Sequence, residues 1–196
     1  MNSRKKIGVL ALQGAFIEHI ASLQKLGVNA LPIRSVPELE TLDGLVIPGG
    51  ESTTIGKLMV PDGFVEPLRE LSQDGFPIFG TCAGMILLAK SVLDSDVGTI
   101  RAMNIKVRRN AFGRQVDSFE ISLPIPALGE LPFPAVFIRA PIIVEAEPGV
   151  EILARLPDGT AVAARQENLL VSAFHPELTS DLRFHAYFLK IVAQGA

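Results

Sequence analysis

Short apolar runs alternate with amphipathic segments through the first half of the chain, and this alternation limits the possible folds more than any other feature. Residues 6–12, 44–50 and 76–80 are nearly continuous in apolar side chains, which is typical of parallel strands covered on both faces. Residues 16–27 carry apolar side chains at helical spacing and end at a glycine. The alternation predicts an α/β fold: a doubly wound, mainly parallel sheet with helices on both faces.

Weaker patterns fill in the rest of this half. Residues 29–33 predict a strand near the sheet edge, because Pro32 cannot donate to a ladder. Residues 35–42 predict a short helix capped by Ser35, and residues 63–75 predict a longer helix. Another helix is expected over residues 83–92.

The second half changes to short strand candidates separated by proline and glycine. They occupy residues 105–109, 118–123, 135–140, 142–146 and 150–156. The Pro-Asp-Gly turn at 157–159 predicts a hairpin with residues 160–165. We therefore expect residues 1–196 to form a single domain, in which antiparallel strands extend the parallel sheet.

The chain closes with a buried strand at residues 168–174 and a helix at residues 180–194. Ser180 or Asp181 is the candidate cap of this helix. The residues expected to reach the core are Leu182, Tyr187, Leu189 and Ile191.

Composition excludes several classes of function. The net charge of −3 over 196 residues predicts neither nucleic-acid binding nor a polybasic membrane patch. The apolar stretch near the N-terminus is short and better read as a first strand than as a signal peptide. One cysteine and three histidines make a metal site improbable, and the lone thiol suits a cytoplasmic protein.

The lone cysteine, Cys82, stands directly after a predicted strand in the sequence Gly-Thr-Cys-Ala-Gly. This G-x-C-x-G pattern is the thiol counterpart of the serine nucleophile elbow. A sharp turn from strand to helix strains the backbone of the nucleophile and leaves no room for side chains at its flanks. The helix N-terminus favours the thiolate, and the amide of Ala83 is placed to stabilise an oxyanion. A small buried cysteine is the competing interpretation.

A base for this thiol is available in His175, which follows the last predicted strand. Pro176 fixes the turn, and Glu177 stands two residues from the histidine, so both side chains can project the same way. The carboxylate would then hold one ring nitrogen and leave the other for the thiol, as in a catalytic triad. His19 and His185 lie inside predicted helices, where packing or solvent exposure is the usual role.

With these motifs in place, the sequence resembles the class I glutamine amidotransferases. It is most similar to the glutaminase subunits of pyridoxal 5′-phosphate synthase. The motifs that carry the resemblance span residues 8–19, 47–58, 80–89, 107–120, 137–141 and 175–189. The resemblance implies that Cys82 attacks the amide of L-glutamine, that His175 transfers protons and that Glu177 orients His175.

The same resemblance implies roles for further residues. Those implied to bind glutamine are Gly50, Glu51, Ser52, Arg109, Ile138 and Arg139. Backbone amides at Gly49 and Gly50 could complete the oxyanion hole with Ala83, and Gln13 is implied to organise it. On sequence alone, residues 49–52 could equally be a plain turn with Ser52 or Thr53 as a helix cap. Likewise, Arg109 could belong to a charged strand edge.

The family resemblance also implies a partner and no cofactor. Ammonia would pass to a (β/α)₈-barrel synthase subunit, in an assembly of about twelve copies of each chain. Glu18 and His19 would belong to a helix near the partner or behind the site rather than to the chemistry.

Three alternatives stay open at this point. A stress or redox protein of related fold would also carry an elbow cysteine, but would not need the His-Pro-Glu sequence. An ammonia-donating subunit of another pathway, such as histidine biosynthesis, would share the triad. A non-catalytic scaffold is the last, although a decayed subunit should have lost one triad residue.

Overall fold

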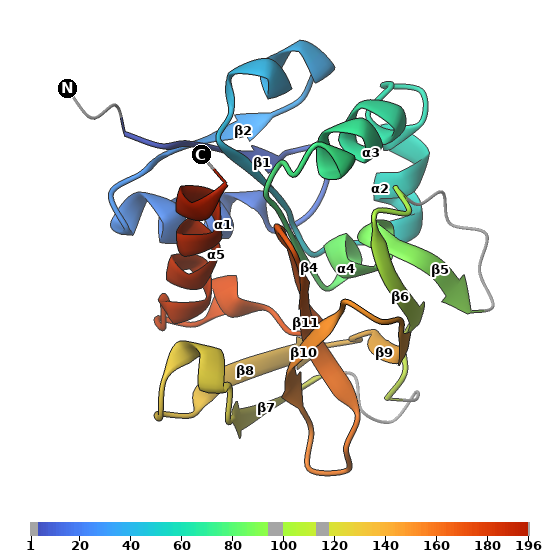
Figure 1. The fold of residues 1–196 in the computed structure, drawn as a ribbon, viewed down its shortest axis with the longest axis vertical. Coiled ribbons are helices and arrows are strands. Elements are labelled where there is room, and N and C mark those ends of the chain that lie inside the picture. The colour runs from blue at the N-terminus through green and yellow to red at the C-terminus, as the bar shows by residue number, and fades with distance from the viewer. Residues whose placement is uncertain (1–3, 94–99, 113–117, 196) are drawn as a thin grey trace.

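The protein is described by a computed structural model over residues 4–93, 100–112 and 118–195 (Figure 1). Within these residues a sheet of ten strands forms the centre, with the order β2-β1-β3-β4-β12-β11-β9-β6-β5 and β10 paired to β11. Five neighbouring strands of it run parallel: β2 (Asn29–Ile33), β1 (Lys6–Leu10), β3 (Gly44–Ile47), β4 (Ile78–Thr81) and β12 (Leu169–Ser172). Their carboxyl ends meet at one rim, where open α/β sheets place their binding sites.

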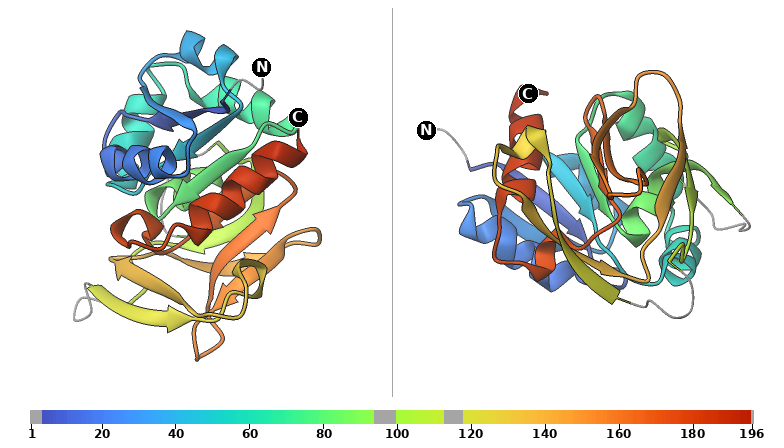
Figure 2. Two further views of the ribbon diagram at one scale, coloured as in Figure 1. Left: turned by 90° about the vertical axis from the view of Figure 1, so that its left-hand side faces the viewer. Right: turned by 90° about the horizontal axis from the view of Figure 1, so that it is seen from below.

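The remaining strands extend this sheet mostly in antiparallel fashion. They are β11 (Ala161–Gln166), β10 (Glu151–Arg155), β9 (Ile142–Ala146), β6 (Met103–Arg108) and β5 (Ala89–Leu93). β5 and β6 form the one parallel pair of this extension in the described residues. A separate hairpin of β7 (Ser118–Leu123) and β8 (Phe133–Ile138) lies beside the main sheet (Figures 1 and 2).

Helices cover both faces of the parallel strands. One side carries α1 (Phe16–Lys25) and α5 (Arg183–Gln194), and the other carries α2 (Ser52–Met59), α3 (Val65–Gln73) and α4 (Ala83–Leu88) (Figures 1 and 2). Three 3₁₀ turns complete the elements: η1 (Val36–Thr41), η2 (Pro126–Leu128) and η3 (Pro176–Leu178). The predicted mixed, mainly parallel α/β architecture is therefore confirmed.

The core between β4 and α5 is built from aromatic rings. Phe79 of β4 lies 5.5 Å from Phe184 and 5.6 Å from Phe188, measured between ring centroids. Phe174 packs edge-on to Phe184 at 5.3 Å, and all four rings are fully buried. Such burial stabilises the fold by roughly 25 cal/mol for each Å² of apolar surface removed from water. Because Phe174 immediately precedes His175, this packing also fixes where the site histidine emerges.

The helix predicted over residues 83–92 is shorter in the structure. α4 ends at Leu88, and residues 89–93 form strand β5 against β6. The backbone N–H groups of Ile100 and Ala102 donate to the carbonyls of Leu87 and Leu88. These carbonyls would otherwise accept the hydrogen bonds of a continuing helix. Tertiary pairing has overridden a local helical pattern.

The caps and core residues of two helices also differ from expectation. Glu51, rather than Ser52 or Thr53, caps α2, because its carboxylate accepts the N–H groups of Thr53 and Thr54. The N-cap residue of α5 is Leu182, whose side chain makes no cap, but the predicted Asp181 still accepts the N–H of Arg183, the first residue of the helix, at 3.0 Å.

In α5, Ile191 is fully buried, as expected. The other residues expected in its core, Leu182, Tyr187 and Leu189, are only partly buried. None of the helices in the described part of the chain is long and apolar enough to cross a membrane.

Candidate active site

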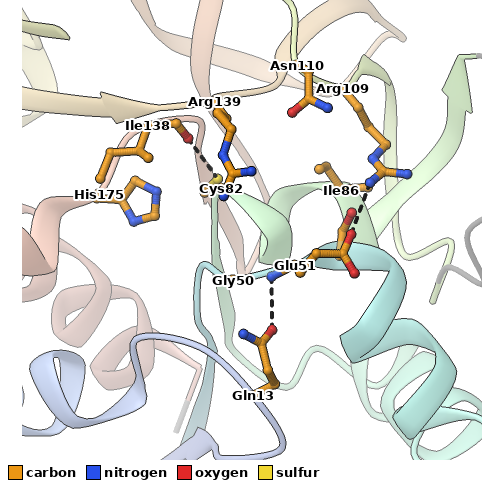
Figure 3. Close-up of a pocket in the computed structure, with 11 residues that line it drawn as sticks. Gln13, Gly50, Glu51, Cys82, Ile86, Arg109, Asn110, Ile138, Arg139 and His175 are labelled. Atoms are coloured by element: carbon orange, nitrogen blue, oxygen red, sulfur yellow. Dashed lines mark hydrogen bonds and ion pairs between the residues drawn. The ribbon is translucent and has the colours of Figure 1, made fainter. Parts of the chain in front are cut away.

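A cavity of about 300 Å³ opens at the rim where the parallel strands end (Figure 3). It collects side chains from loops that are far apart in the sequence. The lining residues are Gln13, Gly50, Glu51, Ser52, Cys82, Ile86, Arg109, Asn110, Ile138, Arg139 and His175. A concave site at this place in an α/β fold is where binding and chemistry are expected.

Cys82 occupies the strained turn that its flanking glycines predict. Its backbone has φ 48° and ψ −100°, a conformation that residues with a side chain rarely adopt. A Cβ on Gly84 would lie 2.1 Å from the Ile47 carbonyl oxygen, and one on Gly80 would lie 2.6 Å from Gly84. The backbone N–H of Cys82 donates to the backbone carbonyl of Ser172 at 2.7 Å. The turn is therefore held open to the cavity by contacts that tolerate only glycine at its flanks.

His175 faces this cysteine from the end of β12. Its backbone N–H donates to the Val136 carbonyl at 2.8 Å, and its ring nitrogen Nδ1 lies 2.7 Å from Oε1 of Glu177. A Cβ on Gly49 would lie 2.4 Å from Cε1 of His175 and 3.4 Å from Cβ of Cys82. The imidazole and Cys82 therefore both border Gly49, and the carboxylate holds the far side of the ring.

The charges of this group follow from its surroundings. Burial opposes the imidazolium form, but interactions with Cys82 and Glu177 outweigh it and raise the pKa of His175 to about 10. Burial also opposes ionisation of Glu177, yet His19 and His175 together lower the pKa of its carboxyl. The arrangement favours an imidazolium held by a carboxylate, which suits proton transfer at the sulfur.

Glu51 organises the opposite wall of the cavity. It caps α2, and its Oε1 lies 3.3 Å from the guanidinium of Arg109. Hydrogen bonding from Thr54 outweighs partial burial and lowers the pKa of Glu51 to about 2. The backbone N–H of Glu51 donates to Oε1 of Gln13 at 2.9 Å, so Gln13 ties the first-strand loop to this turn.

The third wall comes from β8 and the residue that follows it. The Ile138 carbonyl lies 4.0 Å from Sγ of Cys82, and Arg139 adopts a positive φ of 41°. Figure 3 shows the Arg139 and Arg109 side chains on the same side of the cavity, above Cys82 and Glu51. Two guanidinium groups beside a carboxylate and a backbone carbonyl can bind a zwitterion.

Similarity to known proteins places the chain in a family. The model of the SNO glutamine amidotransferase family matches residues 9–194. The chain belongs to this family. A pyridoxal 5′-phosphate synthase subunit PdxT from Moorella thermoacetica is 61% identical over 95% of this chain and 99% of its own. The PdxT of Carboxydothermus hydrogenoformans is 59% identical, and the match covers 97% of this chain and 99% of the length of that relative.

A solved structure described as a glutamine amidotransferase has 46% sequence identity to this chain and a TM-score of 0.91. The match covers 95% of this chain and 98% of that one. The two folds therefore match along nearly the whole length of both chains.

In this SNO family member, the structure brings most of the site residues named from sequence to one cavity. Nine of them line it directly, while Glu177 lies behind His175, Gly49 beneath the imidazole and Ala83 in the first turn of α4. Within the described residues, no cluster of three or more His, Cys, Asp or Glu side chains is arranged to hold a metal ion.

Sequence reasoning missed two groups of residues. Ile86 and Asn110 line the cavity without having been named, although Asn110 directly follows Arg109 and has the positive φ of 45° that asparagine tolerates. His19 was placed on a helix near the partner or behind the site, and the structure buries it behind the site; its hydrogen-bonded contact with the buried His185 was not anticipated. No local sequence signal connects them, since they are 166 residues apart.

Proposed function

We propose that the chain is the glutaminase subunit of pyridoxal 5′-phosphate synthase, and that it hydrolyses L-glutamine to L-glutamate and ammonia. The observation that carries the proposal is the group formed by Cys82, His175 and Glu177 at the mouth of one cavity. Its support is the 2.7 Å contact between His175 and Glu177, together with a strained cysteine elbow beside the same imidazole. Membership of the SNO family and the names of the PdxT relatives point to the same reaction.

At the start of the first half-reaction His175 already holds the proton taken from the Cys82 thiol, and the sulfur of Cys82 attacks the side-chain amide carbon of glutamine. The raised pKa of His175 helps the ring to hold this proton until the amide nitrogen departs. The imidazolium then donates the proton to that nitrogen, the carbon–nitrogen bond breaks and ammonia leaves. A glutamyl thioester remains on Cys82.

In the second half-reaction a water replaces the ammonia. His175 removes a proton from this water as it attacks the thioester carbon, and the sulfur leaves and regains the proton. Glu177 holds Nδ1 of the ring through both steps, so that Nε2 stays directed to the reacting atoms. The backbone amides of Gly49, Gly50 and Ala83 would stabilise the oxyanion in each tetrahedral intermediate.

The walls of the cavity select glutamine by its two charged groups. Arg109 and Arg139 supply guanidinium donors for the α-carboxylate, because a guanidinium fork matches a carboxylate well. The Glu51 carboxylate and the Ile138 carbonyl are acceptors for the α-ammonium group. Gly50 and Ser52 border the substrate, and Gln13 keeps the turn at Gly50 and Glu51 in place.

The ammonia is used by a partner. We propose that the chain docks on a (β/α)₈-barrel synthase subunit, in a complex of about twelve copies of each, which uses the ammonia to build pyridoxal phosphate. The residues 1–196 would act as a single glutamine amidotransferase domain, without a cofactor of its own. Its dependence on a free thiol suits the reducing cytoplasm.

The test is glutamate and ammonia release from glutamine by the purified chain, with and without a barrel synthase subunit. We expect hydrolysis in the presence of the synthase subunit and incorporation of the amide nitrogen into its product. Absence of glutamate release in the mixture, with both chains folded and associated, would refute the assignment. Release without nitrogen transfer to this synthase, but with transfer to the barrel of another pathway, would identify a different partner.

A further inference from the structure

A buried chain of side chains continues behind Glu177, on the side away from the cavity. His19 of α1 and His185 of α5 are both fully buried, and Nδ1 of His19 lies 2.9 Å from Nε2 of His185. Nε2 of His19 lies 3.1 Å from Oγ1 of Thr81 and 3.4 Å from Oε2 of Glu177. Three elements distant in sequence therefore meet at the carboxylate that holds His175.

The carboxylate gives this contact its importance. Oε1 of Glu177 is occupied by His175, whereas Oε2 is fully buried and has no hydrogen bond of good geometry among the described residues. An ionised oxygen that is buried without a donor costs several kcal/mol. The ring nitrogen Nε2 of His19 faces this oxygen at 3.4 Å, and it shares its one N–H with Oγ1 of Thr81, which lies closer at 3.1 Å.

The electrostatics decide which ring nitrogens carry protons. A proton on Nε2 of His19 faces Thr81 and the Glu177 carboxylate, whereas a bare Nε2 would direct its lone pair at a negative charge. Nδ1 of His19 must then accept, so Nε2 of His185 donates and Nδ1 of His185 is bare. That last atom has no hydrogen-bond partner within the described residues, and a buried acceptor without a partner is tolerated better than a donor.

The surroundings keep both rings neutral. The charged or titratable groups that act on His19 are Glu177 and His175 beyond the sheet rim, Glu18 on its own helix and His185 on α5. Burial is the largest influence and lowers the pKa of His19 and of His185. Each ring therefore holds one proton. Hydrogen-bond donation then runs in one direction, from His185 to His19 and from His19 toward Glu177.

We propose that His19, backed by His185, is a positioning residue for the glutaminase reaction: its Nε2–H fixes Oε2 of Glu177 and thereby the orientation of the His175 imidazole. The inference rests on the proposed function. His19 touches neither substrate nor the reacting atoms, so its effect must pass through Glu177 and appear in turnover rather than in glutamine binding.

The experiment compares His19→Leu, which removes the donor, with His19→Gln, whose amide nitrogen can replace Nε2–H. Leu23→Ala is the control, since Leu23 is a fully buried residue on the same helix with no part in the chain of contacts. Each variant is assayed in the complex with the synthase subunit for kcat and KM. The pH dependence of Cys82 alkylation by iodoacetamide is measured alongside, and the reaction is specific because Cys82 is the chain's one cysteine.

We expect His19→Leu to lower kcat roughly ten-fold with KM for glutamine within two-fold of the original, as for the loss of one hydrogen bond to a charged group. The midpoint of its alkylation profile should move to higher pH, because a misplaced Glu177 holds the imidazolium less well. His19→Gln should retain most of the original kcat and an alkylation midpoint close to the original. In a Glu177→Gln background, His19→Leu should lower kcat by less than about two-fold more.

Two results would overturn the inference. One is equal kcat and an unchanged alkylation profile in His19→Leu and Leu23→Ala, with only thermal stability reduced, which would make His19 a packing residue. The other is a full ten-fold loss added to the Glu177→Gln background. Failure of the unaltered complex to release glutamate would instead refute the proposed function, and the alkylation profiles would still test the His19 contact.

Discussion

The two sides of Glu177 place histidines in opposite charge states. On the cavity side, His175 lies 2.7 Å from the carboxylate and its pKa is raised to about 10. On the core side, His19 lies 3.4 Å from the other carboxylate oxygen, and burial lowers the pKa of His185 behind it to about 3. One carboxylate thus separates a charged imidazole from a pair of neutral ones.

The difference lies in what accompanies burial. His175 is buried but has both a carboxylate and a sulfur as partners, so the imidazolium is stabilised more than burial destabilises it. His185 is buried against aromatic rings such as Phe79, and its hydrogen-bond partner among the described residues is another imidazole, that of His19. The cavity side can therefore exchange protons in the reaction, whereas the core side can only hold them.

The largest effect is expected when a member of the cavity-side pair, Cys82 or His175, is replaced. Cys82→Ala and His175→Asn should each lower glutamine hydrolysis by about a thousand-fold or more, because nucleophile and base act as a unit. Far-UV circular dichroism and association with the synthase subunit should be unchanged. Measurable ammonia release by purified Cys82→Ala would refute the nucleophile.

A pair of glycine substitutions separates the position of the His175 ring from the packing of the turn that carries Cys82. In Gly49→Ala the new Cβ would press on the His175 ring at 2.4 Å, and a displaced base should cost about 100-fold in kcat. In Gly84→Ala it would meet the Ile47 backbone oxygen, so we expect the fold to lose about 2–3 kcal/mol in addition to any displacement of Cys82.

Hydrolysis assays and chemical denaturation of both glycine variants provide the measurement. Equal stability loss in the two variants, or an active Gly49→Ala, would contradict the placement of the imidazole against Gly49.

The opposite charge states predict opposite dependences of stability on pH. His185 is neutral in the fold and protonated when unfolded below pH 6.5, so its contribution is present above that pH and is lost on acidification toward pH 3. This amounts to about 1.5 kcal/mol between pH 6.5 and 5. His175 is charged in the fold, so its contribution is present below pH 6.5 and is lost as the pH rises to about 10.

Urea denaturation across this range measures both slopes. His185→Phe should flatten the acid side and leave the alkaline side unchanged, and His175→Asn should do the reverse. An unchanged acid slope in His185→Phe would mean that this ring is not neutral in the fold.

The smallest expected effect concerns the wall of the cavity. Glu51→Ala removes the cap of α2 and the contact with Arg109, and should cost about 1 kcal/mol of stability with a several-fold rise in KM. Calorimetry and steady-state kinetics in the complex measure the two changes. A large loss of kcat at unchanged KM would indicate that Glu51 takes part in the chemistry instead.

Much of the parallel half could be predicted from sequence because its signals are local. The strand at residues 29–33 has the predicted bounds, and it lies at the sheet edge as Pro32 indicated. Cys82 and His175 were found because each follows a buried strand, and the ends of parallel strands meet at one rim. The spacing of His175 and Glu177 was enough to predict their contact, which the structure shows at 2.7 Å.

What could not be predicted depends on contacts between distant segments. Residues 89–93 are helical in pattern, and only pairing with β6 makes them a strand. His19 and His185 each look like an ordinary helix residue, and their shared contact exists only once α1 and α5 pack on the same face of β4. The cavity side was therefore visible in the sequence, whereas the core side that supports it was not.

The most direct test of the central claim is rapid-quench mass spectrometry of the complex during glutamine turnover. The account predicts a glutamyl group in acid-stable thioester linkage on the peptide that contains Cys82, forming before glutamate appears and absent from Cys82→Ala. Glutamate released at the normal rate with the glutamyl group on another residue, or from Cys82→Ala, would contradict it.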